Sequence, residues 1–216
     1  MTSIDRDLLE QVARALDLPD ASKRLQAALA AGTNPVPGAA EVIVRRCGVE
    51  PDFFVRDMLT WALTRYPADE VFPLVLAETE SPVAQARAQG LHTLSKLADG
   101  RAWPAITDES LADADDEAAR AAWRAAVALV PTDERADLAG RLAGQLGRGG
   151  RDVQLSLSRA FVELGDAAEV ALRQAAGHGD SAVRLHAQAS LRLIRDPDSG
   201  FDAAMAEAKR IMALGS

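Results

Sequence analysis

The sequence predicts an all-α fold, an α-solenoid of about five to six stacked helical hairpins. Segments of similar sequence recur every 30 to 35 residues, and self-similarity at such a period is typical of stacked repeats. Alanine makes up roughly a fifth of the chain and aromatic residues 4%. This composition favours helices over strands, because alanine loses no side-chain entropy in a helix. We find no segment with the alternating apolar pattern of a credible strand.

The repeat is clearest where residues 55–75 are aligned with residues 86–106. Arg56 then matches Arg87, and Phe72-Pro73 matches Trp103-Pro104. The residue before the arginine marks each unit, and this marker recurs at spacings of 31, 32, 35 and 30. The five marker residues are Val55, Ala86, Ala118, Val153 and Val183. Because one helical hairpin cannot bury its apolar face alone, we expect the copies to stack.

Polar residues and glycines predict where the helices begin and end. Second helices of the hairpins are expected to begin at Glu50-Pro51-Asp52, Ser81-Pro82, Asp115-Asp116, Arg151-Asp152 and Asp180-Ser181. Left-handed residues after helix ends are expected at Gly48, Gly100, Gly165 and Gly177. We expect one solenoid domain over 1–216, with N-terminal capping helices in 1–37, repeats in 38–197 and a C-terminal capping helix in 198–216.

The repeated unit is apolar-Arg, then Leu, then Leu-x-x-Leu-Ala/Gly-Asp, then Pro. It resembles the HEAT-repeat family, in particular the short bacterial HEAT-like repeats. The copies that carry the resemblance are Ala86-Arg87 through Asp99 and Pro104, Val55-Arg56 with Pro73, and Val183-Arg184 with Asp196. The resemblance covers roughly residues 38–197 and implies a right-handed α-solenoid. Ala119 and Gln154 replace the arginine, so the arginine series is interrupted.

Charge and cysteine content limit the classes of protein. The net charge of −8 argues against a protein that coats nucleic acid, because phosphate binding needs clustered positive charge. The single cysteine, Cys47, excludes an internal disulfide and a multi-cysteine zinc site, and we expect it to be a small buried residue. No apolar run reaches the ~18 residues of a membrane span. These features predict a cytoplasmic protein that has no membrane partner.

No motif of a hydrolase, phosphate-binding loop or dinucleotide-binding fold occurs in the sequence. The acids at 113–117 lack the glycine and glutamate of a calcium loop and predict a helix N-terminus. His92, His178 and His186 do not share a helix at i, i+4. We therefore expect no catalytic residue, no cofactor and no metal. Trp123 falls in a core register.

The candidate site is the outward face of the second helices. Counted from the marker, the second position gives Asp57, Ala88, Arg120, Leu155 and Leu185; the third gives Met58, Gln89, Ala121, Ser156 and His186; the sixth gives Trp61, His92, Arg124, Arg159 and Ala189. The predicted partner-binding residues are Trp61, Arg65, Gln89, His92, Lys96, Arg120, Arg124 and Arg159. Arginine and tryptophan are enriched in binding hot spots. The alternative is that these residues have no binding role: the arginines are solvated, and Trp61 packs on a neighbouring repeat.

The arginines of the repeated unit, Arg56, Arg87 and Arg184, are expected to form an inter-repeat ladder with the turn acids Asp52 and Asp180.

The leading functional hypothesis is a non-enzymatic scaffold or adaptor, whose concave face binds an acidic segment or helix of another protein. The alternative comes from the resemblance, since some short bacterial HEAT-like proteins are alkylpurine DNA glycosylases. Asp57 and Trp61, one helical turn apart, could imitate their catalytic aspartate and tryptophan. The acidic net charge makes nucleic acid the less expected partner. A regulatory role beside a transcription regulator, or small-molecule binding, is a third interpretation that the sequence does not separate from the first.

Overall fold

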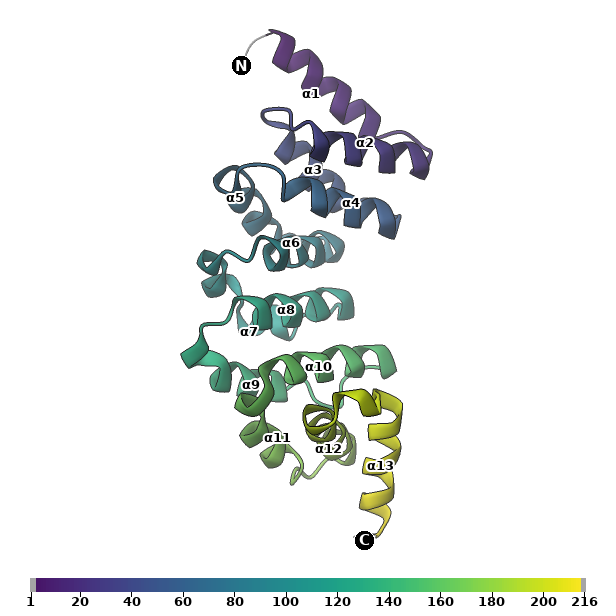
Figure 1. Cartoon of the computed structure of the whole chain (residues 1–216), viewed down its shortest axis with the longest axis vertical. Helices are drawn as coiled ribbons and strands as arrows, with labels where there is room; N and C mark the ends of the chain where they lie inside the picture. Colours follow the sequence, from purple (N-terminus) through teal and green to yellow (C-terminus); the bar gives the residue numbers. More distant parts are fainter. Residues whose placement is uncertain (1–2, 215–216) are drawn as a thin grey trace. The chain divides into compact units, whose positions relative to one another are not determined.

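The computed structural model describes the backbone of residues 3–214 and the side chains of residues 6–213. The chain is 77% helical, and its described part contains no strand. Within the described residues, thirteen α-helices pack in a repeat-like arrangement (Figure 1). The contacts divide the chain into two compact units, residues 1–105 and residues 106–216. The all-α prediction is confirmed.

In the first unit, successive helices form hairpins that lie beside one another. The second helices α2, α4 and α6 pack in that order, and so do the first helices α1, α3 and α5. The elements are α1 (Ser3–Leu16), α2 (Ala21–Thr33), α3 (Ala39–Cys47), α4 (Phe53–Leu63), α5 (Ala68–Glu78), α6 (Ala84–Leu97) and the 3₁₀ helix η1 (Gly100–Ala105).

The second unit repeats this arrangement. Helices α8, α10 and α12 pack in order, as do α7, α9 and α11, and α13 packs on α12. The elements are α7 (Asp108–Leu111), α8 (Asp116–Leu129), η2 (Thr132–Glu134), α9 (Arg135–Ala143), α10 (Arg151–Leu164), η3 (Gly165–Ala168), α11 (Glu169–Ala175), α12 (Ser181–Arg195), η4 (Pro197–Ser199) and α13 (Phe201–Leu214). None of the described helices is long and apolar enough to cross a membrane.

Aspartate N-caps begin three of the five predicted second helices. Asp52, Asp115 and Asp180 each accept hydrogen bonds from two backbone N–H groups of the first turn, as predicted. Helix α6 instead begins after Val83, because the Ser81 hydroxyl accepts from the Val83 N–H in a local turn before the helix.

The glycines that were expected in left-handed conformations differ from the prediction. Of the four, only Gly165 has a positive φ, of 59°. Gly48 has a right-handed conformation, and a Cβ there would lie 3.1 Å from that of Ala86, so it permits a close approach of α6. The left-handed residue after α6 is Ala98, with a φ of 51°.

The arginine of the repeated unit holds the loop that precedes its own helix. Arg56 Nη1 donates to the carbonyl oxygens of Glu50 and Pro51, six and five residues earlier. Arg184 binds the equivalent carbonyls of His178 and Gly179. Arg56 and Arg184 therefore do not form the predicted ladder with Asp52 and Asp180, whose carboxylates cap helices.

The same contact extends the repeat to residues outside the predicted range. Arg24, four residues after the N-cap Asp20, binds the carbonyl oxygens of Leu18 and Pro19. Gln154 replaces the arginine in α10, and its amide donates to the carbonyl oxygen of Gly149. In α2, α4, α10 and α12, the side chain four residues after the N-cap thus donates to loop carbonyls that would otherwise lack partners.

Buried side chains between the helices form the core of each unit. Trp123 is fully buried, and its indole N–H donates to the Leu111 carbonyl oxygen at 2.9 Å, which confirms its core position. Gly32 of α2 packs so closely on α4 that a Cβ there would lie 2.4 Å from Cζ3 of Trp61. The absence of a side chain at Gly32 thus lets α2 and α4 approach.

Candidate partner-binding surface

The eight predicted partner-binding residues lie in both units. Five of them, Trp61, Arg65, Gln89, His92 and Lys96, belong to the first unit, and Arg120, Arg124 and Arg159 belong to the second. The two sets are therefore described separately.

In the first unit, Trp61 combines a packing role with partial exposure. Its ring lies against Gly32, as the packing alternative predicted, yet the residue remains 39% exposed. Arg65 is exposed just beyond the end of α4, and Lys96 is exposed in the last turn of α6. His92 is half-buried on α6. These side chains offer positive charge and one aromatic edge to solvent.

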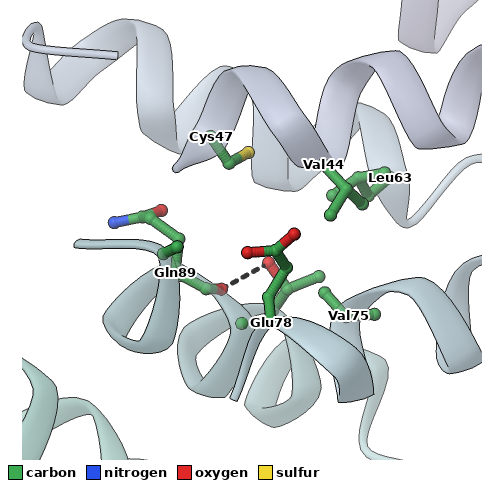
Figure 2. A pocket seen from close by; sticks show the side chains of 9 residues that line it. Val44, Cys47, Leu63, Val75, Glu78 and Gln89 are labelled. Atoms are coloured by element: carbon green, nitrogen blue, oxygen red, sulfur yellow. Dashed lines mark hydrogen bonds between the residues drawn. The ribbon is translucent and has the colours of Figure 1, made fainter. Parts of the chain in front are cut away.

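Gln89 lines a small cavity between α3, α4, α5 and α6. The cavity of about 10 Å³ is close to the smallest space that one water molecule needs. Figure 2 shows the side chains of Cys47, Glu78 and Gln89 around it. The amide oxygen of Gln89 is buried without a hydrogen-bond partner among the described groups.

Cys47 is buried in the same region. Desolvation raises the pKa of its thiol to about 12, so the thiol stays protonated and unreactive at neutral pH. Its prediction as a small buried residue is confirmed.

In the second unit, three arginines gather on the neighbouring helices α8 and α10. Arg124 and Arg159 are exposed and occupy equivalent positions, six residues after their markers. Arg120 is half-buried one turn before Arg124. We call Arg120, Arg124 and Arg159 the arginine cluster.

The arginine cluster has more positive charge than its acidic neighbours neutralise. Arg120 pairs with Glu117 through Nη1, but its Nε is buried without an acceptor. Neither Arg124 nor Arg159 has an acidic partner among the side chains that the structure describes. Desolvation, and then the charge of Arg120, lower the pKa of Arg124 below its usual value. A bound anion would offset the repulsion between Arg120 and Arg124.

The third register does not face outward in the second unit, contrary to the expectation. Ala121, Ser156 and His186 are all buried. The Nδ1 of His186 accepts from the Gly147 N–H at 3.1 Å, and its Nε2 lies 3.0 Å from both the Gln154 carbonyl oxygen and the Ser158 hydroxyl. Desolvation lowers its pKa to about 4, so the ring is neutral at pH 7. The ring satisfies buried polar groups and joins α10 to α12.

Two exposed apolar features were missed by the sequence analysis. Phe53 and Phe54 are 64% and 71% exposed, and their rings meet edge to face at 5.6 Å. They occupy the first turn after the N-cap Asp52, where only Val55 turns inward. Two adjacent aromatics directly after an N-cap were the available signal.

Comparison with known proteins does not assign this chain to a family. No model of a protein family matches the chain, and no curated protein matches it. Among the described residues, no group of three or more His, Cys, Asp or Glu side chains could hold a metal ion.

Proposed function

We propose that this protein is a non-enzymatic scaffold or adaptor that binds an acidic segment or helix of another protein. Its helices form a right-handed solenoid of HEAT-like hairpins, and the outward faces of the second helices line the concave side. The regular pairing of helices within each unit and the repeated loop-binding arginine support this architecture.

The observation that carries the proposal is the arginine cluster. An acidic protein with a net charge of −8 leaves two exposed guanidinium groups unpaired at equivalent positions of adjacent helices. Its other arginines mostly bind acids or carbonyls, for example Arg148 to Asp116 and Arg141 to Asp108. Guanidinium groups bind carboxylates in two-pronged geometry, which suits acidic side chains along a partner.

The test measures binding of a fluorescent acidic helical peptide in which glutamate recurs every three to four residues. Replacing Arg124 and Arg159 together by Glu should weaken binding by at least tenfold and leave helical circular dichroism unchanged. The control replaces Arg173 and Arg195, two exposed arginines, by Glu. It changes the net charge equally and should keep most of the affinity. Equal loss in both variants would reduce the effect to overall charge, and no loss would remove the proposal.

Affinity capture with a nuclease-treated lysate of the source organism then separates protein from nucleic-acid partners. A protein that the wild type retains and the Arg124→Glu/Arg159→Glu variant loses identifies the partner. A band shift with duplex DNA that weakens steeply with salt would instead favour the DNA-binding alternative. That alternative would use Asp57 and Trp61, both on α4.

A further inference from the structure

Exposed apolar side chains gather where the second helices of the first unit begin. Ten large apolar residues are exposed among the side chains that the structure describes. Half of them belong to the loops before α2, α4 and α6 or to the first turn of α4. We call these five residues the apolar ridge: Leu18, Val49, Phe53, Phe54 and Val83. Such clustering differs from the scattered single apolar residues of an ordinary surface.

Hydrogen bonds join the three loops of the apolar ridge into one surface. Arg24 binds the Leu18 carbonyl oxygen at 2.9 Å and the Glu50 carboxylate at 2.8 and 2.7 Å. Gln85, in the first turn of α6, donates to the carbonyl oxygen of Glu50 at 2.9 Å. The loop before α4 is therefore tied both to the loop before α2 and to the start of α6. The five side chains share one edge of the unit and need no partner to be held there.

Helix stability does not explain the residue types of the ridge. Val83 is the N-cap of α6 and makes no side-chain cap hydrogen bond, whereas Asp52 caps α4 at the equivalent position. Valine is among the least favourable N-cap residues. Phe53 and Phe54 occupy the first two positions of α4 and remain 64% and 71% exposed. Apolar side chains thus stand in solvent where polar ones would suit the helices better, as expected of a surface that associates.

The charged groups beside the ridge already have partners within the chain. Arg56 donates to two carbonyl oxygens of the loop before α4, and its guanidinium lies 5.9 Å from the centre of the Phe53 ring. Asp20 and Asp52 cap α2 and α4. These groups therefore do not select a charged partner. An apolar patch whose neighbouring charges are satisfied resembles the interface of a homodimer, which is more apolar than that of a transient complex.

The phenylalanine pair is able to match its own copy. The rings of Phe53 and Phe54 meet edge to face at 5.6 Å, with 78° between their planes. Ring faces are negative and ring edges positive, and the pair presents both to solvent because each residue is well over half exposed. Two pairs related by a twofold axis can extend these edge-to-face contacts across an interface in which each copy offers the same patch.

The exposed area of the ridge suits a weak dimer. With about 200 Å² for each phenyl side chain and about 100 Å² for each aliphatic one, the ridge exposes about 400 Å² of apolar surface per copy. Two copies would bury about 800 Å² of it. Since about 65% of a homodimer interface is apolar, the whole interface would measure about 1,200 Å². This area is at the lower end of specific interfaces, so we expect a dissociation constant in the micromolar range.

We propose that the apolar ridge is a dimer interface, and that its occupant is the ridge of a second copy of this chain, related by a twofold axis. The phenylalanine pair of α4 lies at the centre, and Leu18, Val49 and Val83 surround it. This inference is independent of the proposed function, because the ridge belongs to the first unit and the arginine cluster to the second.

Sedimentation velocity of the full chain between about 1 and 200 μM tests the proposal. The mass of the wild type should rise from that of the monomer toward twice that value. The Phe53→Ser/Phe54→Ser variant keeps the cap Asp52 and should have unchanged circular dichroism, while its dissociation constant should rise at least about tenfold. The control, Val170→Ser/Ile211→Ser, removes two other exposed apolar side chains and should dimerise as the wild type does.

Three outcomes of this measurement would overturn the proposal. The first is a wild type that stays monomeric over the whole concentration range. The second is a Phe53→Ser/Phe54→Ser variant that dimerises like the wild type, or a control that loses dimerisation equally. The third is a mass that grows well beyond the dimer, because such growth indicates a contact that does not close around a twofold axis.

Hydrogen exchange of the wild type shows where the copies meet, even if the double variant does not fold. The amides of residues 49–56 should exchange at least about threefold more slowly at high than at low protein concentration, and those of α10 should not change. Protection confined to other segments would overturn the proposal. Acidic-peptide binding should be equal in the wild type and the Phe53→Ser/Phe54→Ser variant, so failure of the dimer and failure of the proposed function are measured separately.

Discussion

Glu50 is the most informative residue to perturb, because its carboxylate is fully buried and heavily hydrogen-bonded. Its oxygens accept from Arg24 at 2.8 and 2.7 Å, from Arg46 at 3.0 and 2.8 Å, and from the Asp52 N–H at 2.9 Å. Glu50 thus joins α2, α3 and the start of α4. The perturbation is Glu50→Gln, which keeps the shape and removes the charge.

The expected loss of stability comes from the guanidinium of Arg24, which stays buried and charged after the substitution. The Arg24 side chain is only 6% exposed and would lose its counterion. Removing one partner of a buried ion pair costs about 3–5 kcal/mol. Arg24 keeps its bonds to the carbonyl oxygens of Leu18 and Pro19, so we expect the lower end, about 3 kcal/mol. For a chain of this size, that corresponds to a fall in Tm of about 6–12 °C.

The assay is urea unfolding followed by far-ultraviolet circular dichroism. The control is Glu41→Gln on α3, the helix that also carries Arg46; the Glu41 side chain is 62% exposed and lies 3.9 Å from Arg45. It should change the free energy of unfolding by less than about 0.5 kcal/mol. If Glu50→Gln also stays within about 1 kcal/mol of the wild type, the buried pair does not hold these helices together and the reasoning fails.

The pH dependence checks the same residue independently. Desolvation alone would raise the pKa of Glu50, but hydrogen bonds from Arg24, the Asp52 N–H and Arg46 outweigh it and lower the pKa to about 2. Because the unfolded carboxylate takes up a proton first, this stabilisation is complete above pH 4.5 and is lost as the pH falls toward 2. The Glu50→Gln variant should lose less stability over that range than the wild type.

Three further predictions concern packing, backbone and protonation. Gly32→Ala would place a Cβ 2.4 Å from the Trp61 ring; it should lower the unfolding free energy by about 1–3 kcal/mol and change tryptophan fluorescence. Unchanged stability would show that the ring moves freely. Ala98→Gly should raise the unfolding free energy by about 1 kcal/mol in urea titrations, because Ala98 has a left-handed backbone; a decrease would contradict this. His186 should titrate near pH 4 by NMR. Since its unfolded pKa is higher, the buried neutral ring should make stability fall by about 3 kcal/mol between pH 7 and pH 4. The His186→Gln variant lacks this ring and should lose correspondingly less stability over the same range; an equal loss in both proteins would contradict the prediction.

The sequence alone determined the class of fold and the positions of most helices. The repeat spacing, the alanine content and the aspartate N-caps are recognisable within short segments of the chain. They can therefore be interpreted without knowing which helices pack together. Asp52, Asp115 and Asp180 were predictable because an N-cap bonds within its own helical turn. Trp123 was predictable as core from helical periodicity alone.

Only the tertiary structure decided which residues face outward and what each arginine binds. His186 falls on the third predicted outward register and Ala189 on the sixth, but α10 covers His186 and α13 covers Ala189. The side chains that donate hydrogen bonds to Glu50 are Arg24 on α2, 26 residues away, and Arg46 on α3. Such contacts depend on how helices pack rather than on spacing within one helix. Sequence periodicity could therefore place Arg124 and Arg159 in one register. It could not show that these two arginines lack acidic partners.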